Sequence, residues 1–98
     1  MPDDYTPKFH PKFFDDLERL NEKEKEIVSK QIEKIKRDPT RFKRMHGTDN
    51  CYRIRIANLR IVYYLAGKTI CFLVVERRKI VYGIYFRRLL RIKRELGR

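Results

Sequence analysis

The sequence has 98 residues, of which 42 % are hydrophobic and 39 % charged, and its formal net charge is +12. A chain of this length can bury one modest core, so we expect a single domain over residues 1–98. No apolar run reaches membrane-spanning length, and the N-terminal stretch MPDDYTPKFH lacks the apolar segment of a signal peptide, which predicts a cytoplasmic protein.

The first half of the chain predicts a short strand and two helices. Tyr5–Phe9 suits an edge strand, because its proline lacks the N–H that a central strand needs. Helical spacing of apolar residues follows over residues 12–20. Asn21 is placed to cap a second helix, with Glu24 at the capping-box position, and this helix should end near Arg37.

The second half predicts an antiparallel meander and a last helix. Residues 40–50 read as a basic loop, and strands are expected at 51–57, 59–65 and 69–76. Residues 80–97 have the apolar spacing of a helix. A short N-terminal edge strand, a two-helix hairpin, a three-strand antiparallel meander and a C-terminal helix together make an α+β fold.

The positive charge is concentrated in this second half. Residues 1–40 contain nine Lys or Arg and ten Asp or Glu, whereas residues 41–98 contain sixteen and three. Such an asymmetry is typical of proteins that bind nucleic acid or another anionic surface. Solvated surface arginines are the plainer alternative, but several of these arginines lie in predicted strands, which favours a polyanionic partner.

The most informative segment is the predicted hairpin CYRIRIANLRIVYYLA. Arg53 and Arg55 alternate with apolar residues, so the first strand has one cationic and one apolar face. Arg60 lies between two apolar residues of the second strand, where a charge is costly unless it is paired. We therefore expect either a bound anion or a salt bridge from Arg60 to Asp49 or Glu76.

The residue types favour chemistry on RNA over metal-dependent cleavage of DNA. RNA carries its own nucleophile, the 2′-hydroxyl, and needs positive charge to stabilise the phosphorane and a group to move protons. DNA cleavage usually needs clustered carboxylates that hold metal ions. Residues 41–98 offer only Asp49, Glu76 and Glu95. The histidines and cysteines lack zinc-ligand spacing, and no glycine-rich phosphate loop is present, so no metal or cofactor is expected.

These elements and motifs resemble the RelE/ParE toxin superfamily. CYRIRIANLRIVYYL is similar to the central signature of that superfamily, and LVVERRKIVY to its final strand and the basic run that follows. The resemblance covers about residues 5–82 and is closer to the ribosome-dependent RelE-type messenger RNA endonucleases than to the gyrase-directed ParE branch. It implies a metal-independent endoribonuclease toxin of a type II toxin–antitoxin system, with a RelB-like antitoxin, the ribosome and messenger RNA as partners.

The resemblance also implies which residues carry the reaction. Arg60 would hold the scissile phosphate, Arg78 would stabilise developing charge, and Tyr82 would stack on a base or assist proton transfer. The residues expected to bind RNA are Arg53, Arg55, Arg77 and Lys79. In RelE-like enzymes the positions of Arg53 and Arg55 are often lysines, one of them assigned to proton transfer. Arginine stays protonated, so the proton-transfer group is open.

Other interpretations stay open at the level of both residues and function. Arg53 and Arg55 could merely cover a sheet face, and Tyr82 could belong to the core, with Tyr85 in its place. His46 could move a proton, although a loop histidine is more often plain surface. The protein could instead be a non-catalytic RNA-binding module of the same fold, or a ParE-like inhibitor of DNA gyrase.

Overall fold

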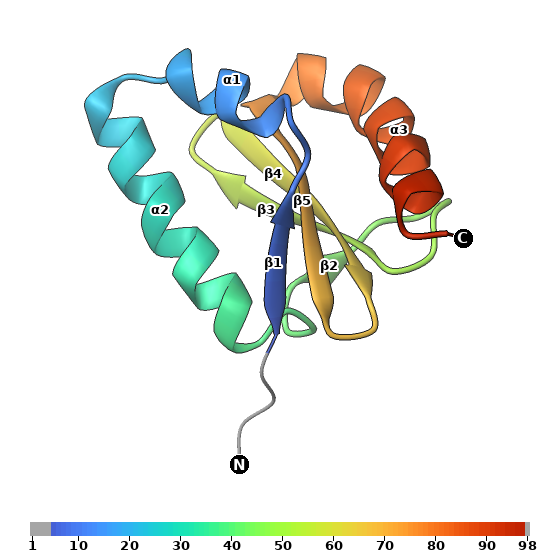
Figure 1. Cartoon of the computed structure of the whole chain (residues 1–98). Helices are drawn as coiled ribbons and strands as arrows, with labels where there is room; N and C mark the ends of the chain where they lie inside the picture. The colour runs from blue at the N-terminus through green and yellow to red at the C-terminus, as the bar shows by residue number, and fades with distance from the viewer. Residues whose placement is uncertain (1–4, 98) are drawn as a thin grey trace.

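The computed structural model describes residues 5–97, which form a five-stranded sheet with helices on both faces (Figure 1). Residues 1–4 and Arg98 of the expected 1–98 domain lie outside this part. The elements are β1 (Thr6–Phe9), α1 (Phe13–Glu18), α2 (Glu22–Arg37), β2 (Lys43–Arg44), β3 (Cys51–Ile56), β4 (Leu59–Ala66), β5 (Thr69–Arg77) and α3 (Arg78–Glu95). The predicted α+β class is confirmed.

The strand order is β1-β5-β4-β3-β2. The expected meander is present, since β3, β4 and β5 pair in antiparallel fashion, and β1 is an edge strand that pairs in parallel with β5. The loop predicted at 40–50 is wrong in one respect, because Lys43 and Arg44 form β2 opposite Arg53 and Tyr52. Two residues are too few to show the alternation that reveals a strand in sequence.

The sheet separates two hydrophobic cores. On the α1 and α2 side, Phe13, Val28 and Ile35 pack against the apolar face of β3 and its neighbours. On the other side, the buried face of α3 packs against residues of β4 and β5, including Val62 and Leu73. Figure 1 shows α2 and α3 on opposite sides of the strands. The strand alternation in the sequence therefore assigns each side chain to one of two different helical layers.

The second helix begins as its sequence predicts. The Asn21 side chain accepts a hydrogen bond from the Glu24 N–H at 2.8 Å, and the Glu24 carboxylate accepts one from the Asn21 N–H at 3.1 Å. This reciprocal pair satisfies two backbone donors that would otherwise lack partners. The hydrogen bond from the Asn21 backbone, and then that from Arg77, lower the pKa of Glu24 below its ordinary value.

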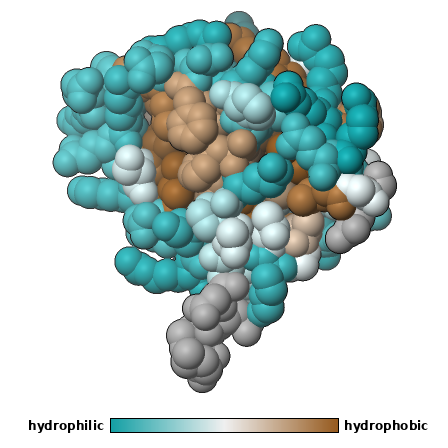
Figure 2. Space-filling view, viewed as in Figure 1, coloured by the Kyte–Doolittle hydropathy of each residue, from teal (hydrophilic) through white to brown (hydrophobic). Residues whose placement is uncertain are grey.

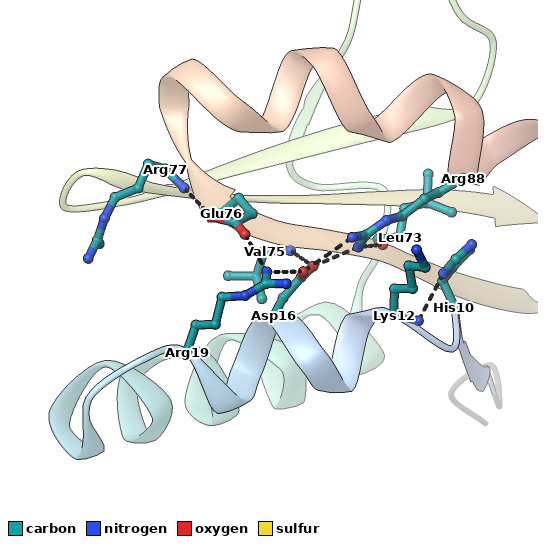
Figure 3. Close-up of polar contacts among 9 residues, drawn as sticks. All are labelled: His10, Lys12, Asp16, Arg19, Leu73, Val75, Glu76, Arg77 and Arg88. Atoms are coloured by element: carbon teal, nitrogen blue, oxygen red, sulfur yellow. Dashed lines mark hydrogen bonds and ion pairs between the residues drawn. The ribbon is translucent and has the colours of Figure 1, made fainter.

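A buried ion pair joins α3 to α1 at the edge of β5 (Figure 3). Arg88 is only 8 % exposed, although its side chain is charged. It donates to Asp16 at 2.7 and 3.2 Å and to the Leu73 carbonyl at 2.8 Å, while Asp16 also accepts from the Val75 N–H at 3.1 Å. The pair thus supplies hydrogen-bond partners to the backbone of β5 beyond the end of β1. A bulge in the pairing of β4 with β5 lies at the same place and leaves Leu73 without a partner residue in β4.

The side of the molecule that is viewed in Figure 1 and Figure 2 has a mostly hydrophilic surface, and an apolar patch lies between α2 and β1. Phe14 is 53 % exposed, and its ring centroid lies 5.2 Å from that of the half-buried Phe9. Within residues 5–97, no helix has the length and apolar character needed to cross a membrane.

Candidate nucleic-acid interface

Five basic side chains line a pocket of about 290 Å³ beside the start of α3. They are Lys43, Arg53, Arg55, Arg60 and Arg78. No carboxylate is among these lining residues, so the pocket concentrates positive charge that an anion would neutralise. Because α3 packs mainly over β4 and β5, it leaves Arg55 of β3 exposed and Arg53 only half-buried.

Strand register explains why the charges meet. Lys43 of β2 lies opposite Arg53, and Arg55 lies opposite Arg60 of β4. Residues directly opposite each other share one face of the sheet, where two like charges destabilise the pairing. The cationic face that the alternation of β3 predicts is thus confirmed, and a bound anion would relieve its repulsion.

Arg60 is the most buried of these cations, at 5 % exposed. Its Nη1 donates to the carbonyls of Leu59 at 2.9 Å and Ala57 at 3.3 Å, rather than to Asp49 or Glu76 as the salt-bridge alternative required. Glu76 instead accepts from Arg19 at 2.9 Å. A guanidinium has five N–H donors, so the two carbonyls leave donors of Arg60 available for a ligand.

A second pocket, of about 520 Å³, adjoins the first and shares Lys43 and Arg53 with it. Its other lining residues are Arg44, Met45, His46, Tyr82 and Tyr85. The Tyr82 hydroxyl accepts a hydrogen bond of 2.5 Å from Arg53 Nη1, which leaves its own O–H free to donate. Tyr82 is 37 % exposed, so the alternative interpretation that it belongs to the core is wrong.

The two tyrosines differ in their setting. Tyr85 packs partly against the second core, whereas Tyr82 is held at the pocket by Arg53. His46 comes from the loop between β2 and β3 and is exposed. A phosphate in the first pocket would therefore place its attached base or sugar next to tyrosine, methionine and histidine side chains, which suit stacking and hydrogen bonding to RNA.

Two of the residues expected to bind RNA lie outside both pockets. Arg77 precedes Arg78 directly, yet its guanidinium donates to Glu24 at 3.1 Å and Asn58 at 3.3 Å. Glu24 belongs to α2, on the opposite face of the sheet from α3. Arg77 reaches this face because it is the last residue of β5, in which successive side chains point to opposite faces. Lys79 is exposed and lines neither pocket.

The last helix begins two residues earlier than expected, at Arg78, which places this arginine in its first turn. The Arg78 N–H donates to the Asn58 carbonyl at 3.3 Å, which holds the helix start beside the β3–β4 turn. The positive end of the helix dipole thus adds to the charge of the pocket. Within residues 5–97, no three His, Cys, Asp or Glu side chains gather in a group that could hold a metal ion.

Solved toxin structures share this fold. A variant of the Escherichia coli toxin RelE in its free state has a TM-score of 0.75 at 19 % identity, covering 86 % of this chain and 96 % of RelE. A chain of the RelB-RelE antitoxin-toxin complex from Methanococcus jannaschii has a TM-score of 0.67 at 28 % identity, and the match covers 78 % of this chain and 95 % of that one. A chain of the archaeal RelE-RelB complex from Pyrococcus horikoshii has a TM-score of 0.65 at 21 % identity, and the match covers 76 % of this chain and 96 % of that one.

The sequence gives an independent match. No curated protein sequence matches the chain significantly. Residues 8–82, however, match the family described as "ParE toxin of type II toxin-antitoxin system, parDE". This segment begins in the second half of β1 and ends at Tyr82, and so includes the whole of β2 to β5 and the start of α3. The chain therefore belongs to the ParE toxin family, within the RelE/ParE superfamily of type II toxin–antitoxin toxins.

Proposed function

We propose that this protein is a toxin that cuts messenger RNA on the ribosome without a catalytic metal ion. The observation that carries the proposal is the pocket of five basic side chains without a carboxylate, adjoined by the Tyr82 hydroxyl. Transfer of the scissile phosphate to the 2′-oxygen builds negative charge on a phosphorane, which preorganised arginines stabilise. The tyrosines beside the pocket suit the bases of a single-stranded message.

The proposed roles follow from position. Arg60 holds the scissile phosphate from the buried end of the pocket, and Arg78 stabilises the charge that develops on it. Arg53 and Arg55 bind the phosphate chain, and Arg53 also orients the Tyr82 hydroxyl through its hydrogen bond. Tyr82 stacks on a base or donates its free O–H. Arg77 and Lys79 contribute only long-range attraction to the message.

We also propose a RelB-like antitoxin as the partner and the cytoplasm as the site of action. The solved relatives in complex with RelB support the partner. An acidic segment of an antitoxin would complement the cationic pocket and compete with RNA for it. The ribosome and its message, which the proposal requires, are in the cytoplasm.

The decisive experiment is translation of a reporter message in a purified system, with 3′ ends mapped by primer extension. The wild type should cut the message and leave a 2′,3′-cyclic phosphate, and added EDTA should not stop cleavage once the magnesium need of the ribosome is met. Arg60→Ala and Arg78→Ala should each lose about 2–4 kcal/mol of transition-state stabilisation, as expected for one charge-stabilising donor. Arg94→Ala is the matched control, because this exposed arginine of α3 lines neither pocket.

The outcomes separate the alternatives. If the Arg60→Ala/Arg78→Ala double variant cuts as fast as the wild type, the site is wrong. If the wild type binds RNA without cutting it, the non-catalytic RNA-binding module takes precedence. In that case the Arg53→Ala/Arg55→Ala/Arg60→Ala variant should still reduce the salt dependence of binding by about 2 units, at about 0.7 per single-strand phosphate contact.

Inhibition of DNA gyrase is the second candidate function, and the match to the ParE toxin family favours it. A gyrase inhibitor would leave messages intact on the ribosome and block supercoiling of relaxed plasmid by purified gyrase. The same protein preparation can be used in both assays. If the protein cleaves the message and leaves the supercoiling activity of gyrase unchanged, the result supports the proposed endoribonuclease.

A further inference from the structure

The cationic pocket contains one side chain that differs from the others in proton chemistry. Four of its five basic residues are arginines, whose guanidinium does not release its proton in proteins. Lys43 is the exception, because an ammonium can give up a proton and recover it from solvent. Cleavage of RNA needs such a group, since the leaving 5′-oxygen must be protonated as its bond to phosphorus breaks.

The position of Lys43 suits this role. It lies opposite Arg53 in the pairing of β2 with β3, so the two side chains project from the same face of the sheet. It lines both pockets, and therefore stands at the boundary between the arginines that would hold the phosphate and the residues that would contact the adjoining nucleotide. Within residues 5–97, no carboxylate forms an ion pair with its amine.

We propose that Lys43 is the general acid of the RNA cleavage proposed above, and this assignment rests on that function. The 2′-oxygen forms a bond to phosphorus and its proton passes to solvent water. The bond between phosphorus and the 5′-oxygen breaks, the electron pair stays on that oxygen, and the Lys43 ammonium gives it a proton. The products are a 2′,3′-cyclic phosphate and a 5′-hydroxyl, and the neutral amine takes a proton from solvent.

The pairing with Arg53 makes the assignment testable by exchange. Lys43→Arg keeps the charge but replaces the ammonium with a guanidinium that does not give up a proton, so cleavage should fall by about 100-fold or more, within the range of general acid catalysis. Adding Arg53→Lys to this variant returns an amine to the same face on the neighbouring strand and should recover most of the rate. Lys30 is an exposed lysine of α2 that lines neither pocket, so the Lys30→Arg variant should cut like the wild type.

A sulfur substitution separates proton donation from binding. A synthetic message with sulfur in place of the 5′-oxygen at the cleavage position has a leaving group that needs no proton. Ribosomes programmed with the oxygen or the sulfur message are mixed with each variant, and the rates are compared. Lys43→Arg should be slow on the oxygen message and within about threefold of the wild type on the sulfur message, because the acid contribution is then no longer required. A residue that only binds phosphate would affect both messages equally.

Three results would overturn the assignment. The first is equal loss on both messages, and the second is a Lys43→Arg variant that cuts the oxygen message at the wild-type rate. The third is an oxygen-specific loss in His46→Ala in place of Lys43→Arg, which would make His46 the acid. In each case the wild type still cuts, so the proposed function stands. A wild type that cuts neither message removes the proposed function and the acid together.

Discussion

The ion pair between Asp16 and Arg88 provides the sharpest test of what holds the fold together. Arg88→Met keeps the apolar length of the side chain but removes its two hydrogen bonds to Asp16 and the one to Leu73. Breaking a buried pair by removing one partner costs about 3–5 kcal/mol. Asp16 keeps the Val75 N–H at 3.1 Å and Arg19 at 3.4 Å, so we expect a loss near the lower limit, about 3 kcal/mol.

The measurement is thermal unfolding followed by circular dichroism, with urea unfolding for the free energy. For a domain of this size, a loss of about 3 kcal/mol lowers Tm by about 12–24 °C. Arg87→Met is the matched control, since this exposed neighbour should change the free energy of unfolding by at most about 0.5 kcal/mol. Adding Asp16→Asn to Arg88→Met removes the stranded charge but keeps an acceptor for Val75, so stability should partly recover. A single Arg88→Met variant that unfolds like the control would refute the reasoning.

Two further predictions concern buried polar side chains. Burial, and then the positive charges of Arg88 and Arg91, lower the pKa of His10 below its ordinary value of 6.5. At pH values between that lowered pKa and 6.5, His10 is therefore protonated in the unfolded chain but neutral in the folded chain. The contribution of neutral His10 to the free energy of unfolding is lost as the pH falls through this range. His10→Asn should weaken the dependence of the free energy of unfolding on pH there, and identical pH profiles for wild type and His10→Asn would contradict this. Tyr63, whose pKa is raised chiefly by burial, donates its O–H to the Pro39 carbonyl at 2.6 Å. Tyr63→Phe should cost about 1–3 kcal/mol in urea unfolding by leaving that buried carbonyl without its donor, and an unchanged midpoint would show that the hydrogen bond contributes nothing.

Local patterns in the sequence predicted a large part of the structure. The capping box at Asn21 and Glu24 depends on residues three positions apart, and the cationic face of Arg53 and Arg55 depends on alternation within one strand. Both rules are properties of a short stretch of backbone, and both are confirmed. The resemblance carried by the hairpin also led to the family that residues 8–82 match.

Contacts between distant segments could not be predicted in this way. Lys43 faces Arg53 only because β2 pairs with β3, and a two-residue strand leaves no periodic signal. Arg77 and Arg78 are adjacent and equally charged, yet they have different surroundings. Arg77, the last residue of β5, donates a hydrogen bond to Glu24, whereas Arg78, the first residue of α3, lines the pocket. Their roles diverge at a boundary that sequence patterns locate only to within a few residues.

By itself, the sequence determined the α+β class, the order of the main elements and the placing of strand arginines on one face, because hydrophobic period and capping act within a few residues along the chain. Only the tertiary structure decided which charges are buried and which are free. Arg88 is enclosed because Asp16, 72 residues away, lies beside it at the edge of β5. Arg60 is buried against backbone carbonyls with its remaining donors available for a ligand. The environment of a charge depends on which distant groups packing brings to it, and packing is a property of the whole fold.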